Sequence, residues 1–229
     1  MLFVVASMEI ELEGLCGLDK SGKHWESCDL VYTGIGKENV RKTMKSLLLK
    51  GDPAMEGILS VGFVGSIHPE VKPGDLCLVD KVRTSDREKG FIPDRDWRDR
   101  AGTALGGKFR TCGLLTVEET TSSVEEKRSL RAKGASIIDQ ETYWVAKEAD
   151  ERDLPFLSIR VVFDGINQDL PPARCYDSDS GKVLPGKVFR WLAEEPSGLK
   201  GLPRLGWNSV RARGRLTDAV NSVVPALLE

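Results

Sequence analysis

The chain has 229 residues, of which 40% are hydrophobic and 30% are charged, and its formal net charge is −2. This composition is typical of a globular protein long enough to bury a sizeable core. A net charge this close to zero gives no electrostatic case for nucleic-acid binding.

The cysteines and histidines argue against two further classes of site. Five scattered cysteines without a CxxC pair predict reduced thiols in a cytoplasmic protein, not a disulfide framework or a zinc site. His24 and His68 have no second metal ligand near them in the sequence, so no metal site is expected. The apolar start Leu2–Ala6 is too short, and too soon followed by Glu9, to be a signal peptide or a membrane span.

Apolar runs bounded by glycine and proline turns predict seven strands. In chain order they are expected at Leu2–Ser7, Leu30–Thr33, Gly57–Gly65, Leu76–Val82, Phe109–Val117, Ala135–Ile138 and Phe156–Phe163. Helical spacing or a capping box predicts helices at Met8–Leu15 (or a tight turn), Lys37–Lys50, Ser123–Lys133 and between the last two strands. The charged stretch Arg83–Ala101 is interpreted as a solvated loop or flap. This alternation favours a three-layer αβα domain with a mixed, mostly parallel sheet.

The texture changes after Asp164, which predicts a main domain at 1–182 and a helical extension at 183–229 packed on it. Asn167–Gly181 is expected to be a loop, Val183–Leu192 a helix, and Leu202–Leu228 one or two helices. The tail is rich in arginine and tryptophan. An amphipathic basic tail can contact a membrane surface or pack against its own domain, and both readings stay open.

Three acids flank the helix between the last two strands. Asp139 and Glu141 come at its start, and Asp164 ends a strand apolar enough to be central in a sheet. Ligands bind at the carboxyl ends of such strands. Glu141, in the first helical turn, is expected to stay ionised because of the helix dipole. The alternative is that these acids only cap helices, which is the favoured role for Asp139.

Two glycine turns are further candidates. The backbone N–H groups of Gly34-Ile35-Gly36 can close on an anion, or the segment is an ordinary strand-to-helix turn. The glycines of Val61–Gly65 suggest a close approach of the backbone to a ligand or to a neighbouring element.

Several motifs in the same order resemble the purine nucleoside phosphorylase/uridine phosphorylase superfamily, and in particular the methylthioadenosine/S-adenosylhomocysteine nucleosidases. They are Val4–Glu11, Thr33–Lys37, Val61–Gly65, Lys72–Leu76, Ile138–Glu141 and Arg160–Asp164. A narrower resemblance is to the hopanoid-biosynthesis-associated phosphorylases, whose presumed substrate is adenosylhopane, a nucleoside attached to a lipid. It rests on Leu114–Val117, Leu130–Ala132, Asp169–Pro172 and Phe189–Leu192.

The resemblance implies a nucleoside phosphorylase-like catalytic domain that cleaves the N-glycosidic bond of a purine nucleoside or of a nucleoside-bearing lipid. Asp164 matches the acid that protonates the leaving base, and Glu11 matches the base that orients attacking water. The substrate-binding positions of the family correspond to Glu141 (which holds the ribose hydroxyls), Gln140, Arg160, Gly65 and Phe63. The resemblance also implies a homo-oligomer.

The nucleophile stays open between water and phosphate. Glu11 would repel a phosphate dianion, whereas the hopanoid-associated group is presumed to be phosphorolytic. Candidate cations for phosphate are Arg41, Arg83 and Arg87. No cofactor is expected, and phosphate would be a co-substrate only in the phosphorolytic reaction.

Two departures from the family pattern support an alternative function. Gln140 replaces a methionine of the ribose motif, and Phe63 stands where the nucleosidases have a serine beside the attacking water. Glu118–Thr121 lacks the apolar pair that encloses adenine, which leaves the purine specificity open. The alternative is a catalytically impaired nucleoside-binding protein of the same fold. A scaffold whose acids are purely structural is a third reading.

Overall fold

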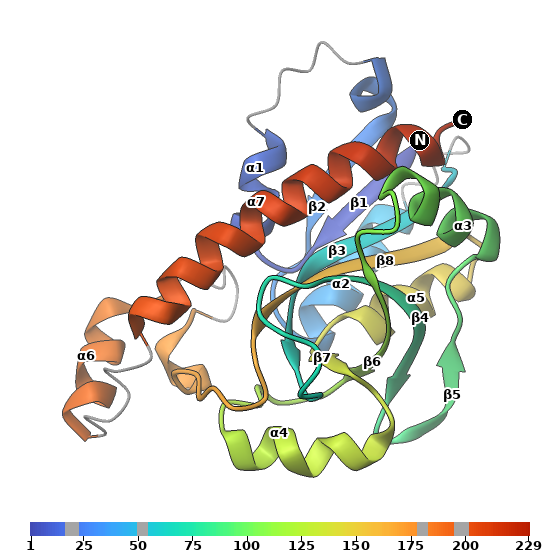
Figure 1. The fold of residues 1–229 in the computed structure, drawn as a ribbon. Coiled ribbons are helices and arrows are strands. Elements are labelled where there is room, and N and C mark those ends of the chain that lie inside the picture. The colour runs from blue at the N-terminus through green and yellow to red at the C-terminus, as the bar shows by residue number, and fades with distance from the viewer. Residues whose placement is uncertain (17–22, 50–54, 178–182, 195–201) are drawn as a thin grey trace.

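The computed structural model describes residues 1–16, 23–49, 55–177, 183–194 and 202–229 (Figure 1). Its strands are β1 Leu2–Ala6, β2 Cys28–Tyr32, β3 Gly57–Ser66, β4 Leu76–Thr84, β5 Arg87–Phe91, β6 Arg110–Thr116, β7 Ile137–Asp139 and β8 Phe156–Asp164. Its α-helices are α1 Glu9–Cys16, α2 Lys37–Leu49, α3 Arg95–Ala104, α4 Val124–Leu130, α5 Thr142–Asp150, α6 Pro185–Glu194 and α7 Leu202–Leu227. Short 3₁₀ turns occur at Lys23–Ser27, Arg131–Lys133 and Ala173–Cys175.

The strands form one mixed sheet that partly closes on itself. The main order is β2-β1-β3-β7-β6-β4-β5, and β8 pairs with both β3 and β4. Five of the eight pairings in the described part of the chain are parallel, which confirms the mixed, mostly parallel sheet. β3 and β4 are linked through β8 on one side and through β7 and β6 on the other. These five strands therefore form a closed ring of pairings, in the order β3-β7-β6-β4-β8.

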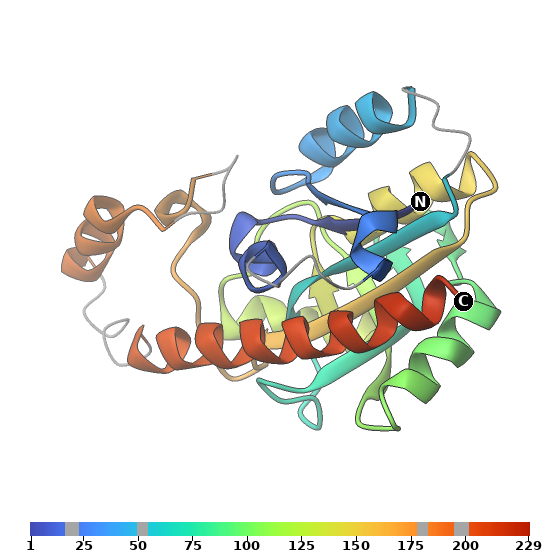
Figure 2. The same cartoon turned by 90° about the horizontal axis from the view of Figure 1, so that it is seen from above.

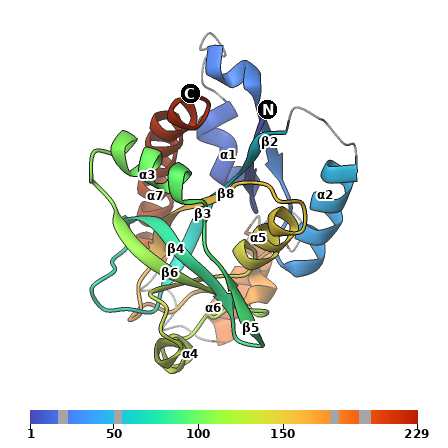
Figure 3. The ribbon, with the colours of Figure 1, turned by 90° about the vertical axis from the view of Figure 1, so that its right-hand side faces the viewer.

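Helices cover the two faces of the sheet and give two hydrophobic cores (Figures 2 and 3). On one face α3 and α7 pack on β8 and α1 packs on β1, β2 and β3, with Trp97 and Leu216 among the buried side chains. On the other face α2 and α5 supply Met44 and Trp144 to a second core. The three-layer αβα arrangement is therefore confirmed.

The C-terminal residues form one long helix, not two. The second half of α7 is part of the core, with Leu216, Val220 and Val223 fully buried. Its first half extends past the sheet together with α6 (Figure 1). The expected domain boundary at residue 182 and the end of the predicted loop at 181 lie outside the described residues, so the division into two units stays a prediction.

The interpretation of Arg83–Ala101 as a solvated loop is wrong. The segment forms the end of β4, the edge strand β5 and the start of α3, where Asp94 accepts a hydrogen bond from the Trp97 N–H (2.9 Å) as the N-cap. Its many charges lie on the outer side of α3 and form pairs four residues apart, such as Asp96 with Arg100. Burial of Trp97 and Ala101 on the inner side decides the structure.

In the described part of the chain, Cys77, Cys112 and Cys175 are free thiols. No group of three or more histidines, cysteines or acids with a metal-binding arrangement occurs among the described residues. Of the helices within the described ranges, none is both long and apolar enough to span a membrane.

If the second half of α7 is integral to the core, replacing Leu216 with alanine should cost about 2–5 kcal/mol of unfolding free energy, because the site cannot collapse around the cavity left behind. Urea denaturation measures this cost. Asp218→Ala, an exposed position one half-turn away on the same helix, is the control and should change stability little. Equal stability of the two variants would mean that α7 is a loosely attached extension.

Candidate active site

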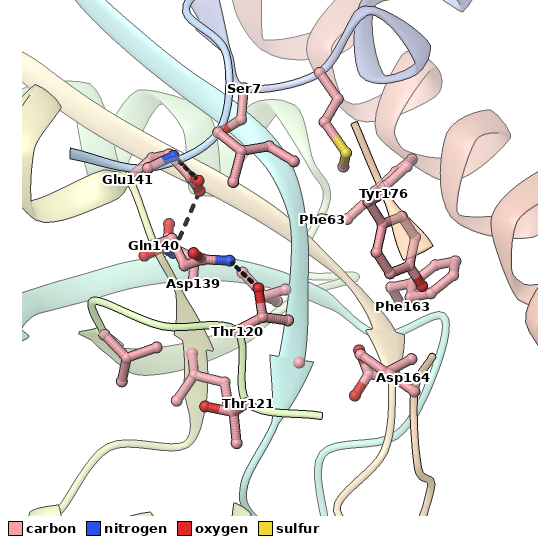
Figure 4. Close-up of a pocket in the computed structure, with 18 of the residues that line it drawn as sticks. Ser7, Phe63, Thr120, Thr121, Asp139, Gln140, Glu141, Phe163, Asp164 and Tyr176 are labelled. Carbon is pink, nitrogen blue, oxygen red and sulfur yellow. Dashed lines mark hydrogen bonds between the residues drawn. The ribbon is translucent and has the colours of Figure 1, made fainter. Parts of the chain in front are cut away.

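A cavity of about 400 Å³ opens where the carboxyl ends of β1, β3, β7 and β8 meet (Figure 4). Its lining includes Glu11, Gly36, Phe63, Gly65, Thr120, Gln140, Glu141, Phe163, Asp164 and Tyr176. Glu141 and Gln140 lie on one side, and Asp164, Phe163 and Tyr176 lie on the other. The structure therefore brings together all the proposed site residues except Arg160.

A bulge at the end of β8 directs two consecutive side chains to the cavity. Val162 pairs with Val64 and Asp164 pairs with Gly65, so Phe163 has no partner of its own on β3. Phe163 and Asp164 therefore both line the cavity, although neighbours on a regular strand point to opposite faces. The Phe163 ring stacks on Phe63 with a centroid distance of 6.1 Å, which makes an apolar wall beside the acid.

Asp164 is buried and paired with Lys127. The Lys127 Nζ lies 2.6 Å from Asp164 Oδ2, and neither side chain is appreciably exposed. Burial raises the pKa of Asp164, and the Lys127 ammonium opposes that rise. Lys127 comes from α4, whose N-terminus has the predicted capping box between Ser123 and Glu126.

Glu11 accepts three backbone hydrogen bonds. Its Oε2 accepts from the N–H groups of Ser7 (3.0 Å) and Met8 (2.8 Å), and its Oε1 accepts from that of Phe63 (2.6 Å). Burial raises the pKa of Glu11, while these N–H groups and Arg160 lower it. A carboxylate oxygen has two acceptor sites, so Oε1 keeps one for a water in the cavity.

Glu141 is the N-cap residue of α5 but makes no capping bond. Its Oε1 accepts from the N–H of Gly36 (2.8 Å), so the first glycine turn binds the protein's own Glu141 carboxyl group, and this N–H opposes the rise of its pKa. Burial and the neighbouring Asp139 raise the pKa of Glu141 to about 8. The expectation that the helix dipole keeps Glu141 ionised is therefore wrong, because loss of solvation outweighs the dipole in this buried position.

Asp139 and Arg160 form a buried network beneath the cavity. Asp139 Oδ2 accepts from the Thr142 N–H (3.0 Å), which confirms its predicted role as a helix cap. The Arg160 guanidinium donates to Ser60 Oγ (2.7 Å) and Thr142 Oγ1 (2.6 Å) and lies 3.5 Å from Asp139. Arg160 is thus held behind the residues that line the cavity. Its predicted contact with substrate stays a prediction, and this position does not favour it.

Two further predicted positions lie in the cavity wall. Gln140 Nε2 donates to Thr120 Oγ1 (3.0 Å), so this side chain is turned along the wall and joins it to the segment after β6. A Cβ on Gly65 would lie 3.2 Å from the Ile138 side chain and 3.3 Å from Asp164 Oδ2. Because Gly65 has no side chain, the Asp164 carboxyl group can lie close to this part of β3.

Gly62 explains the close approach predicted for the second glycine turn. Its φ is +153°, and a Cβ there would overlap both Arg160 Nη1 and Glu11 Oε1. Only glycine lets these two charged side chains approach β3 at the same point.

Lys127 is the main residue that sequence reasoning missed. It shares a helical stripe with Val124 and Leu130, three residues before and after it, and a lysine on such an apolar stripe was the available signal. Of the proposed phosphate-binding cations, Arg41 pairs with Glu38 (3.8 Å) and Arg83 donates to the Gly134 carbonyl (3.1 Å), both away from the cavity. The side chain of Arg87 lies outside the described residues.

Comparison with known proteins gives a family and a fold. Residues 27–179 match the family model of the phosphorylase superfamily. No curated protein sequence shows a significant match. Among solved structures, the 5'-methylthioadenosine/S-adenosylhomocysteine nucleosidase of Neisseria meningitidis, in complex with methylthio-immucillin-A, has a TM-score of 0.72 at 16% identity, with 97% of each chain covered. Futalosine hydrolase of Helicobacter pylori has a TM-score of 0.66 at 16% identity, covering 96% of this chain and 97% of its own.

The raised pKa of Glu141 predicts a pH-dependent stability. Between its unfolded pKa of 4.5 and its folded pKa of about 8, Glu141 holds a proton only in the folded state, so stability falls as the pH rises through this window. Relative to Glu141→Gln, the unfolding free energy of the wild type should fall with a slope of up to about 1.4 kcal/mol per pH unit. Urea denaturation of both proteins from pH 4.5 to pH 8.5 measures the slope, and parallel curves would show that Glu141 is ionised after all.

Proposed function

This chain belongs to the phosphorylase superfamily, and we propose that it hydrolyses the N-glycosidic bond of a purine nucleoside or of a nucleoside attached to a lipid. The observation that carries the proposal is the pair of carboxyl groups that line one cavity, Asp164 from the end of β8 and Glu11 from the first turn of α1. Bond cleavage needs an acid at the leaving base and a group that orients the nucleophile at the sugar. Asp164 is proposed as the acid and Glu11 as the base.

The polar side of the cavity suits the sugar. Glu141 and Gln140 lie across from Asp164, at a position where they can contact ribose hydroxyls (Figure 4). A protonated Glu141 can both donate and accept a hydrogen bond, which matches a hydroxyl group. The Neisseria meningitidis nucleosidase is complexed with methylthio-immucillin-A, which supports a small nucleoside-like ligand.

Water is the proposed nucleophile, although the family includes phosphorylases. Among the described residues that line the cavity there is no arginine or lysine, whereas Glu11, Glu141 and Asp164 are all present. A phosphate dianion entering such a site would meet like charges without a bidentate cation to hold it. Phosphorolysis would need a cation from outside this lining.

Phe63, Phe163 and Tyr176 form an apolar wall that leads away from the sugar side, which supports a substrate with an apolar substituent. α6 and the first half of α7 lie beyond this wall. They hold three of the six large hydrophobic side chains that are exposed in the described chain, Phe189, Trp207 and Val210, and a fourth, Val183, lies just before α6. A lipid-bearing nucleoside would be reached more readily by a protein that rests on a lipid surface.

We call α6 and the first half of α7 the arm, and we propose an anionic membrane surface as its partner. Arg204, Trp207 and Arg211 recur on one exposed side of α7, and Phe189 on α6 lies between Lys187 and Arg190. Basic residues around exposed aromatic rings match an anionic lipid surface. Two copies of the same arm placed face to face would repel, so a second copy fits this surface less well. The homo-oligomer implied by the resemblance stays a prediction for other surfaces.

The reaction is tested by incubating the protein with adenosine, with and without phosphate, and measuring adenine. Adenine release at the same rate in both conditions is expected. Asp164→Asn should lower kcat by about 10²- to 10⁴-fold, because the leaving base then receives no proton from the site. Glu11→Gln should also lower kcat, and Asp29→Asn, an exposed position on β2, should not.

Two outcomes would decide against the proposed reaction. A requirement for phosphate would make the protein a phosphorylase. Thermal stabilisation by adenosine without any release of adenine would support the impaired nucleoside-binding protein instead.

The membrane partner is tested by co-sedimentation with phosphatidylglycerol and phosphatidylcholine vesicles. Binding to the anionic vesicles alone, weakened by salt, is expected. Arg204→Glu should weaken it by roughly 10-fold or more, since each basic residue near the surface contributes about 1 kcal/mol and the substitution reverses the charge. Lys42→Glu, the same reversal on an exposed face of α2, is the control. Equal binding of both variants would exclude the arm as the contact.

A further inference from the structure

Lys127 is a fully buried cation that the reaction scheme above does not use. Its side chain is 0% exposed, and its Nζ is surrounded by Asp164 Oδ2 at 2.6 Å, the Gly165 carbonyl oxygen at 3.4 Å and the Gln168 carbonyl oxygen at hydrogen-bond distance. An ammonium has three N–H donors, and three acceptors surround it here. A neutral amine would turn a lone pair toward one of these oxygens, so Lys127 is an ammonium.

We propose that Lys127 is a positioning residue that holds Asp164 as a carboxylate in the empty site, so that binding of a purine nucleoside takes up one proton from solvent. This inference rests on the proposed function for the identity of the ligand. Its first part, the charge state of the empty site, does not depend on any reaction.

The two oxygens of Asp164 have different surroundings. Oδ2 is buried and lies 2.6 Å from the Lys127 Nζ as an ion pair, with no hydrogen-bond donor besides it within the described chain. Oδ1 takes no part in this ion pair and is the oxygen left to face the cavity that Asp164 lines. A proton gained on ligand binding would therefore sit on Oδ1, between the carboxyl group and the base. Lys127 keeps Oδ2 as an acceptor and so favours this arrangement.

The other titratable groups around Asp164 do not replace Lys127. The Tyr176 phenol is neutral at physiological pH, because burial and then the charge of Asp164 raise its pKa to about 12. Asp177, Glu11 and Glu141 line the same cavity, and because all three are acids none of them can add positive charge. Within the described chain Lys127 is the one cation that forms an ion pair with Asp164.

The proposed step is balanced in protons. A purine nucleoside presents a nitrogen with only a lone pair to Oδ1, and two lone pairs repel unless a proton lies between them. One proton from solvent therefore enters with the ligand and protonates Asp164. When the glycosidic C–N bond breaks, its electron pair goes to the base and this proton moves to the base nitrogen. Water forms the new C–O bond, its proton leaves through Glu11 to solvent, and Asp164 is again a carboxylate beside Lys127.

The empty protein provides the first test. The unfolding free energies of the wild type and of Asp164→Asn are measured at a series of pH values. Their difference should fall as the pH rises above the pKa of Asp164 in the unfolded chain, and it should become constant above the pKa of Asp164 in the folded protein. In a Lys127→Met background the same difference should become constant at a pH at least one unit higher. Lys127→Arg, which keeps the cation, should leave the wild-type value. If the difference became constant at the same pH in the Lys127→Met background as in the wild type, the proposal would be overturned.

Calorimetry provides the second test, and it uses a variant with intact Lys127 and Asp164. Glu11→Gln is titrated with adenosine in two buffers of different ionisation enthalpy at neutral pH. Uptake of about one proton is expected. The control ligand is 9-deazaadenosine, which has the same shape, no cleavable C–N bond and an N–H in place of the N7 lone pair, and it should bind without uptake. Equal uptake with both ligands, or none with adenosine, would overturn the proposal.

The pH profile of kcat/KM separates this inference from the proposed function. If Lys127 sets the charge of Asp164, the fall in kcat/KM at alkaline pH should move up by at least one pH unit in Lys127→Met. A purely structural role would lower the rate at every pH without moving the profile, and would overturn the proposal. If no nucleoside is cleaved at all, the proposed function fails, but the titration of the empty protein still decides the role of Lys127.

Discussion

The site depends on how four buried carboxyl groups share two buried cations. They are Glu11, Asp139, Glu141 and Asp164, with Arg160 and Lys127 as the cations. An unpaired buried carboxylate is costly, so a group without a cation or several N–H donors takes up a proton instead. Asp139 has Arg160, Asp164 has Lys127, and Glu11 has three backbone N–H groups. Burial raises the pKa of Glu11 and Asp164, and burial together with Asp139 raises that of Glu141 to about 8. Acidic residues of similar chemistry thus receive different partners from their surroundings.

The strand β8 makes this distribution of charge possible. It is paired on both sides and covered by helices on both faces, so its side chains are removed from water without help from a ligand. Arg160 lies in its middle and Asp164 at its end, and the bulge at Phe163 alters the direction of the last side chain. The polar network therefore lies between two apolar cores, whose burial offsets the free-energy cost of the buried charges.

Local patterns in the sequence predicted local features well. The strands, the cap made by Asp139 and the capping box at Ser123 depend on residues a few positions apart, and the structure confirms them. Features that depend on distant segments were missed. Lys127 has its role only because α4 packs against the end of β8, and the pKa of Glu141 is raised only because folding buries it beside Asp139. Charge density was a poor guide at Arg83–Ala101, since it describes the outer side of α3 and not the buried Trp97.

The same charges bear on the choice between water and phosphate. With Asp139 neutralised by Arg160 and Asp164 by Lys127, the cavity has no net positive charge left for a second anion. Water brings no charge, and it can donate a hydrogen bond to the remaining acceptor site of Glu11 Oε1. Proton uptake at Asp164 and proton loss at Glu11 then cancel over one turnover, so the buried charges are the same before and after the reaction. A phosphate dianion would break this balance, because two negative charges would enter a site whose cations are already paired.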